Sequence, residues 1–145
     1  MSINPLNFLA RYLRYIHALA GGAMFILIVV ILLNAYVVTY FQVDGMSMSP
    51  TLHSGQLVGV NLLAYSTQKP KIGDVVIIQY AGDSHISFVK RISGIPGSVV
   101  RYQNKEQILE SDSYFVEGDN RSFSTDSRTF GPINLQQIIG KVIGF

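Results

Sequence analysis

The sequence has 145 residues, of which 48% are hydrophobic, with no cysteine and a formal net charge of +2. The lack of cysteine excludes a disulfide-stapled mini-domain, a thiol nucleophile and a cysteine metal site. Arg11 and Arg14 account for the net charge, because residues 44–145 hold nine Lys or Arg and nine Asp or Glu. Without a basic excess in that part, nucleic acid is not an expected partner.

The first predicted element is an apolar segment over residues 18–43, which contains no charged residue. It exceeds the roughly 20 apolar residues that a helix needs to cross a bilayer. A cleavable signal sequence is the alternative, but its apolar region spans only about 7–15 residues and ends in a small-x-small cleavage pattern, which is missing here. We therefore predict one transmembrane helix over residues 18–40. Residues 1–17 form either an extension of this helix or a stretch that lies on the membrane surface.

The distribution of charge around this helix predicts its orientation. Arg11 and Arg14 precede the helix, Asp44 follows it, and the next basic residue is Lys69. The positive-inside bias therefore places residues 1–17 in the cytoplasm and residues 41–145 outside the cell membrane. We expect a single-pass plasma-membrane protein with one extracytoplasmic domain.

Residues 41–145 consist of short β-rich runs separated by turn residues. The runs are QLVGV, DVVIIQY, HISFVKRI, SVVRY, SYFVEG and QIIGKVIGF. No convincing amphipathic helix appears between them, and no repeat or linker divides the segment. The sequence therefore predicts one compact, mainly β domain attached to the helix.

The run HISFVKRI contains a lysine on an apolar strand face. Side chains alternate between the two faces of a strand, so Phe88, Lys90 and Ile92 point the same way. Burial on that face would penalise the ammonium form and lower the pKa of Lys90, which would make the neutral amine available as a base. Periodicity alone also permits Lys90 to reach solvent from a strand end, or to pair with an acid such as Asp74 or Asp83.

The segment GMSMSPTL, residues 45–52, contains two serines that are candidate nucleophiles. Gly45 permits a sharp turn and Pro50 restricts the chain after Ser49, which is typical of a constrained loop that presents a side chain. A serine beside a lysine can act as nucleophile and base without histidine. Loops of this composition are common, so the segment alone does not decide between Ser47 and Ser49.

Four segments resemble, in order, the sequence boxes of bacterial type I signal peptidases. They are VDGMSMSPTL at 43–52, KIGDVVII at 71–78, SFVKRISGIPGS at 87–98 and GDNRSFSTDSR at 118–128. The resemblance covers most of the chain and includes the preceding membrane anchor. It implies a compact antiparallel β catalytic domain over residues 41–145. It also implies a membrane-bound serine endopeptidase that removes signal peptides from exported preproteins with a Ser/Lys dyad and without a cofactor.

The resemblance implies roles for individual residues. The family's pattern of serine, methionine, any residue and proline assigns the nucleophile to Ser47, and the family's catalytic lysine falls on Lys90. Ser124 falls on the serine that holds the lysine amine. Asp126 and Arg128 fall on the positions that support this serine as an ion pair.

The implied substrates are preproteins that are cut after a small-x-small sequence and bound by strand addition. The substrate-binding residues that we expect are Gln42, Val43, Asp44, Gly45, Met48, Leu52, Ser87, Phe88 and Val89. Core packing is the alternative for the apolar residues of this set.

Several points stay open at this stage. The backbone N–H of Ser47 would stabilise the oxyanion, but Gly45 replaces the serine that donates a second hydrogen bond in one branch of the family. No ligand spacing among His53, Asp83 and His85 predicts a metal site. The rival function is a non-catalytic membrane-anchored β-domain that binds signal sequences or assembles a secretion or pilus complex. The protein export machinery and the lipid bilayer are the further partners that the resemblance suggests.

Overall fold

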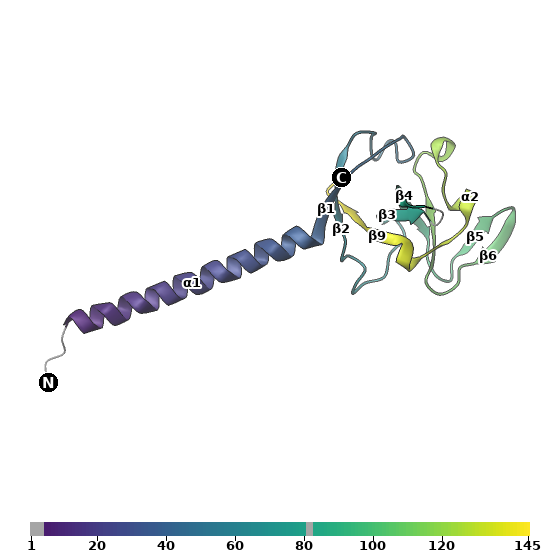
Figure 1. Cartoon of the computed structure of the whole chain (residues 1–145). Coiled ribbons are helices and arrows are strands. Elements are labelled where there is room, and N and C mark those ends of the chain that lie inside the picture. The colour runs from purple at the N-terminus through teal and green to yellow at the C-terminus, as the bar shows by residue number, and fades with distance from the viewer. Residues whose placement is uncertain (1–4, 81–82) are drawn as a thin grey trace. The chain divides into compact units, whose positions relative to one another are not determined.

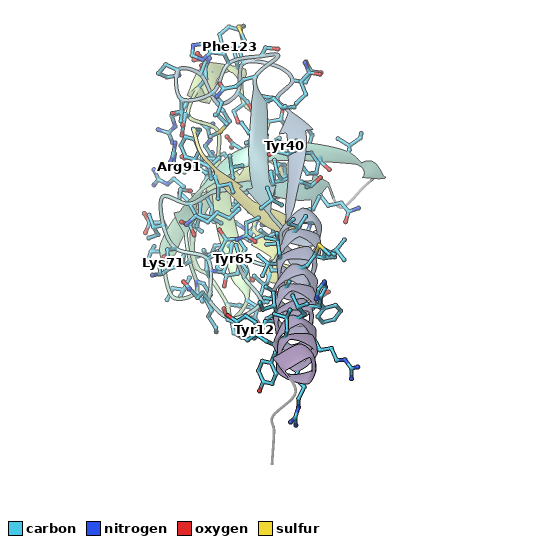
Figure 2. The ribbon with its side chains drawn as sticks, turned by 90° about the vertical axis from the view of Figure 1, so that its left-hand side faces the viewer. Tyr12, Tyr40, Tyr65, Lys71, Arg91 and Phe123 are labelled. Carbon is cyan, nitrogen blue, oxygen red and sulfur yellow. The ribbon has the colours of Figure 1, made fainter. Side chains whose placement is uncertain are left out.

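The structure is a computed structural model that describes residues 5–80 and 83–145. It divides into two compact units, Met1–Tyr36 and Val37–Phe145. The described residues of the first unit form the continuous helix α1, Pro5–Val37, whose last residue belongs to the second unit (Figure 1). Side chains such as that of Tyr12 project from its axis (Figure 2). Its window Arg11–Leu32 has a mean hydropathy of 2.4, so it is long and apolar enough to cross a bilayer. The N-terminal residues from Pro5 onward therefore extend the helix.

The predicted helix boundary at residue 40 differs from the structure. Helix α1 ends at Val37, and Val38–Gln42 form strand β1. Strand β1 pairs antiparallel with β2, Leu57–Asn61, from Val38↔Asn61 to Gln42↔Leu57. The segment VTYFQ combines β-branched and aromatic residues, which fit a strand at least as well as an apolar helix. Pairing with a distant strand decides between the two structures.

The second unit contains two antiparallel sheets in its described residues, which confirms the mainly β fold (Figure 1). The larger sheet has the strand order β1-β2-β9-β3-β4-β7-β8, and β5 pairs with β6 in the smaller sheet. The remaining strands are β3 Val75–Tyr80, β4 Asp83–Gly94, β5 Val99–Tyr102, β6 Lys105–Ile108, β7 Ser113–Glu117, β8 Ile133–Asn134 and β9 Ile138–Ile143. The short helices are η1 Arg121–Phe123, α2 Ser127–Phe130 and η2 Leu135–Gln137.

Each β-rich run of the sequence overlaps one of these strands. Strands β6 and β8 were not predicted, because β6 has three polar residues of four, all of them exposed, and β8 has only two residues. Both lack the apolar alternation that marks a half-buried strand.

Strand β3 is the centre of the core, because it is buried on both faces. Val75 and Ile77 belong to one apolar cluster, whereas Val76 and Ile78 belong to a second cluster on the opposite face. The first cluster also contains Met48 and Leu52 from the loop between β1 and β2. These two buried side chains fix the loop against the sheet, and the loop carries Ser47 between them and β1.

Candidate active site

Two side chains that are far apart in the sequence meet beside the sheet. Ser47 lies in the turn that follows β1, and Lys90 lies in β4, where it pairs with Val76 of β3. Lys90 Nζ donates a hydrogen bond to Ser47 Oγ at 2.9 Å. This distance is within the reach that a general base requires of the hydroxyl it deprotonates. The structure therefore brings Ser47, and not Ser49, to the lysine.

The environment of Lys90 is desolvated, because only 2% of the residue is exposed. Its ammonium group lies 5.4 Å from the centroid of the Phe88 ring, on the apolar strand face that the alternation predicted. Burial lowers the pKa of Lys90, and the negative charge of Asp126 opposes part of this effect. Lys90 does not pair with Asp74, which instead accepts a hydrogen bond from Lys141 Nζ at 2.6 Å.

Asp126 is the centre of a buried hydrogen-bond network beside Ser47 and Lys90. Its Oδ2 accepts from Ser124 Oγ at 2.6 Å, from Gly118 N at 3.0 Å and from Arg128 Nη2 at 2.7 Å. Its Oδ1 accepts from Arg128 Nε at 2.8 Å and Arg128 N at 3.2 Å. Burial favours the neutral acid, but the hydrogen bonds from Arg128, Ser124 and Gly118 outweigh it and lower the pKa of Asp126 to about 2. The carboxylate is therefore ionised, and its charge acts on Lys90.

Gly118 joins this network to the loop that carries Ser47. A Cβ atom at this position would lie 2.5 Å from the carbonyl oxygen of Ser47 and 2.6 Å from Cβ of Ser124. Glycine is therefore required by the close approach of the two segments. The sequence placed this glycine only at the start of the segment GDNRSFSTDSR, and nothing in that segment indicates which other part of the chain approaches it.

A second network, which sequence reasoning also missed, ties the same loops together. Arg91, labelled in Figure 2, donates from Nε and Nη2 to the two carboxylate oxygens of Asp119 at 2.8 and 2.7 Å. Thr51 Oγ1 donates to Asp119 at 2.5 Å, and Asn120 N donates to the carbonyl oxygen of Ser47 at 2.9 Å. The Arg91–Asp119 ion pair thus links β4 to Thr51, and the neighbouring Asn120 binds Ser47 in the same loop. The Lys-Arg and Gly-Asp-Asn sequences were the available signal, but they do not reveal this pairing.

A small cleft of about 90 Å³ opens beside Ser47. The described residues that line it are Phe41, Gln42, Val43, Asp44, Ser47, Ile77, Ser87, Phe88 and Val89. Six of the nine expected substrate-binding residues are in this set. Met48 and Leu52 are instead buried in the core cluster, and Gly45 is exposed with a φ of +83°. The backbone N–H of Gly45 donates to Ser54 Oγ at 3.2 Å.

Two strand edges border this cleft. Strand β1 is the edge strand of the large sheet, and its only sheet neighbour among the described strands is β2. In β4, residues 87–89 pair with β3, whereas pairing with β7 begins at Arg91. Residues 42–44 and residues 87–89 both line the cleft, and residues 87–89 lie outside the pairing of β4 with β7.

Within the part of the chain that the structure describes, no group of three His, Cys, Asp or Glu side chains could hold a metal ion. The side chains of Asp83 and His85 lie outside the described residues. His53 lies in the loop between β1 and β2, where its backbone N–H donates to Gln56 Oε1 at 3.0 Å.

Comparison with known proteins gives consistent similarities. The family model for signal peptidase, peptidase S26, matches residues 16–109 and 103–144. Proteins named signal peptidase IB from Staphylococcus aureus strains Mu50 and N315 are each 29% identical over 156 residues, which cover 79% of this chain and 81% of theirs. Signal peptidase I from Pseudomonas fluorescens is 29% identical over 127 residues, covering 77% of this chain and 43% of its own.

Proposed function

The chain belongs to the signal peptidase family, peptidase S26, and we propose that it removes signal peptides from exported preproteins with a Ser47/Lys90 dyad. The observation that carries the proposal is the 2.9 Å approach of Lys90 Nζ to Ser47 Oγ, at a site where Lys90 is 2% exposed. An amine with a lowered pKa is unprotonated in a larger fraction of molecules near neutral pH than a solvated lysine is. This fraction is the form that can act as a base.

The reaction proceeds through an acyl-enzyme. The neutral Lys90 amine accepts the hydroxyl proton while Ser47 Oγ forms a bond to the scissile carbonyl carbon. The carbon–nitrogen bond then breaks, and the Lys90 ammonium transfers its proton to the departing amine nitrogen. Water attacks the resulting ester, Lys90 accepts one of the water protons, and this proton returns to Ser47 Oγ as the acyl group leaves as a carboxylic acid.

The surrounding residues position the dyad. The backbone N–H of Ser47 stabilises the oxyanion of the tetrahedral intermediate. Ser124, Asp126 and Arg128 act as positioning residues, because Asp126 binds both other side chains and its charge limits how far the pKa of Lys90 falls. Gly45 has no side chain that could donate a second hydrogen bond to the oxyanion, so another group must donate it.

The proposed substrate mode is addition of a strand in the cleft. An extended peptide would add beside residues 42–45 on one side, through the backbone groups of Gln42 and Asp44, and beside residues 87–89 on the other, because β1 is an edge strand and residues 87–89 lie outside the pairing of β4 with β7. The inner wall is apolar, with Val43, Ile77 and Val89, and the small volume of the cleft supports selection of small side chains such as alanine. The substrate class is therefore an exported preprotein with a small-x-small sequence before the cut.

The proposed location is the plasma membrane. Helix α1 would be the single membrane anchor, with residues 1–17 in the cytoplasm because Arg11 and Arg14 precede the apolar window. The domain over residues 41–145 would then be extracytoplasmic. On that side of the membrane, exported preproteins present their cleavage sites as they leave the export machinery.

The test uses the detergent-solubilised full chain with several preproteins, and the cut is mapped by mass spectrometry. Ser47→Ala and Lys90→Ala should each abolish cleavage, and the double variant should be little worse than either single variant, because the two side chains act as a unit. Ser49→Ala is the matched control and should retain activity. If cleavage persists in Ser47→Ala and is lost in Ser49→Ala, the nucleophile is Ser49 and the proposed assignment to Ser47 is wrong. Binding of signal peptides without cleavage by the unaltered protein would favour the rival non-catalytic function.

A further inference from the structure

The cleft beside Ser47 has one formally charged side chain among its described lining residues, that of Asp44. Asp44 is exposed, and no ion pair of Asp44 is found in the described part of the chain. The two other acids close to the dyad differ in this respect, because Asp119 is paired with Arg91 and Asp126 with Arg128. Asp44 is therefore an uncompensated negative charge at the cleft.

The backbone around Asp44 determines which way its side chain points. Val43 is buried in the core, and both of its backbone groups are bonded away from the cleft, since Val43 N donates to Gln56 O and Gly55 N donates to Val43 O. Residues 43 and 44 lie just beyond β1, but the two bonds of Val43 continue the antiparallel pairing of β1. In such extended backbone, neighbouring residues point their side chains to opposite faces and their backbone groups to opposite edges. Asp44 therefore directs its backbone groups to the cleft edge and its side chain to the solvent face.

A peptide added along this edge has the same alternation. The two small residues of a small-x-small sequence point to the inner apolar wall formed by Val43, Ile77 and Val89, so the middle residue between them points to the solvent face. Cross-strand neighbours on one face interact, and opposite charges on such neighbours attract each other. The middle residue of the substrate is thus the one whose side chain lies on the same face as Asp44.

We propose that Asp44 is a specificity-determining residue that favours preproteins with Lys or Arg at the middle position of the small-x-small sequence. The inference rests on the proposed function and on strand addition, and it adds a charge preference that small-residue selection alone does not contain. Because Asp44 is exposed, the preference is modest and sensitive to salt. A basic middle residue should be favoured over a neutral one by about two- to five-fold, the range that an exposed ion pair produces.

The test compares preproteins that differ only at the middle position, which carries Lys, Gln or Glu. The measured quantity is kcat/KM with the full chain in uncharged detergent. The order Lys, Gln, Glu is expected at low salt, and the differences should shrink at about 1 M salt, where the screening length falls to about 3 Å. Asp44→Asn should abolish the order, and Asp44→Lys should reverse it. The matched control is Glu110→Gln, which removes an exposed acid that does not line the cleft and should preserve the order.

The outcomes separate this inference from the proposed function. If all three preproteins are cut at equal rates, or if Asp44→Asn keeps the order, the role of Asp44 is refuted while the peptidase remains established. A charge scan along the substrate whose largest effect falls on another position overturns the assignment to the middle residue. If none of the preproteins is cut, the proposed function fails, and this inference fails with it.

Discussion

The substitution Gly118→Ala tests how closely the nucleophile loop and the Ser124 segment must approach. The added methyl group would lie 2.5 Å from the carbonyl oxygen of Ser47, whereas ordinary van der Waals contact begins at 3.4 Å. The shortfall is about 0.9 Å, and it concerns a backbone atom that cannot rotate away. Either the Ser47 loop or the Ser124 segment must therefore move by roughly that amount.

A displacement of about 1 Å at catalytic groups can reduce a rate by on the order of 100-fold. We therefore expect kcat/KM for a preprotein to fall about 100-fold in Gly118→Ala. Overpacking should also cost about 1–3 kcal/mol of unfolding free energy. The assay is preprotein cleavage at fixed pH together with denaturant unfolding of the full chain in detergent, so that loss of activity is separated from loss of fold.

The matched control is Gly140→Ala in β9, where the added methyl would lie 2.6 Å from the backbone oxygen of Asn61. This clash is comparable, but it involves strands β9 and β2 and not the segments that carry Ser47 and Ser124. Gly140→Ala should lose a similar amount of unfolding free energy. Its kcat/KM per folded molecule should fall little. The reasoning is refuted if Gly118→Ala keeps activity within about three-fold of the unaltered protein, or if Gly140→Ala loses as much activity per folded molecule.

Three further predictions follow from the charges and the exposed surface. The rising limb of kcat/KM against pH should report a Lys90 pKa below the ordinary 10.5, and Asp126→Asn should shift this limb to lower pH because it removes the charge that raises that pKa. Asp126 should contribute about 2 kcal/mol to the free energy of unfolding above pH 4, and this contribution is lost as the pH falls towards 2. The measurement compares acid unfolding of the unaltered protein with that of Asp126→Asn, and identical acid profiles would contradict the prediction. A truncated protein that begins at Val38 keeps β1 and should fold but self-associate without detergent, because Tyr40 and Leu57 are exposed; a monomer in detergent-free size-exclusion chromatography would contradict this.

Much of the fold could be predicted because its signals are local. The long apolar run that became α1, the short apolar run that became β3 and the β-rich runs that became β2, β4 and β9 can all be recognised from neighbouring residues. The same alternation predicted that Lys90 shares a strand face with Phe88, and the structure buries Lys90 there. The fate of Val38–Gln42 was not a local matter, since these residues are apolar enough for a helix and become a strand by pairing with β2.

The sequence by itself determined which residue types and strand faces were available to the site, and its resemblance to a family identified Ser47 and Lys90. Only the tertiary structure decided that these side chains meet, because residues 43 positions apart must be brought together by the loop that Met48 and Leu52 anchor in the core. It also decided that Gly118 lies against Ser47 and that Asp44 remains unpaired beside the cleft. Such contacts depend on which segments the folded chain packs together, and no periodicity within a single segment encodes the identity of its neighbour.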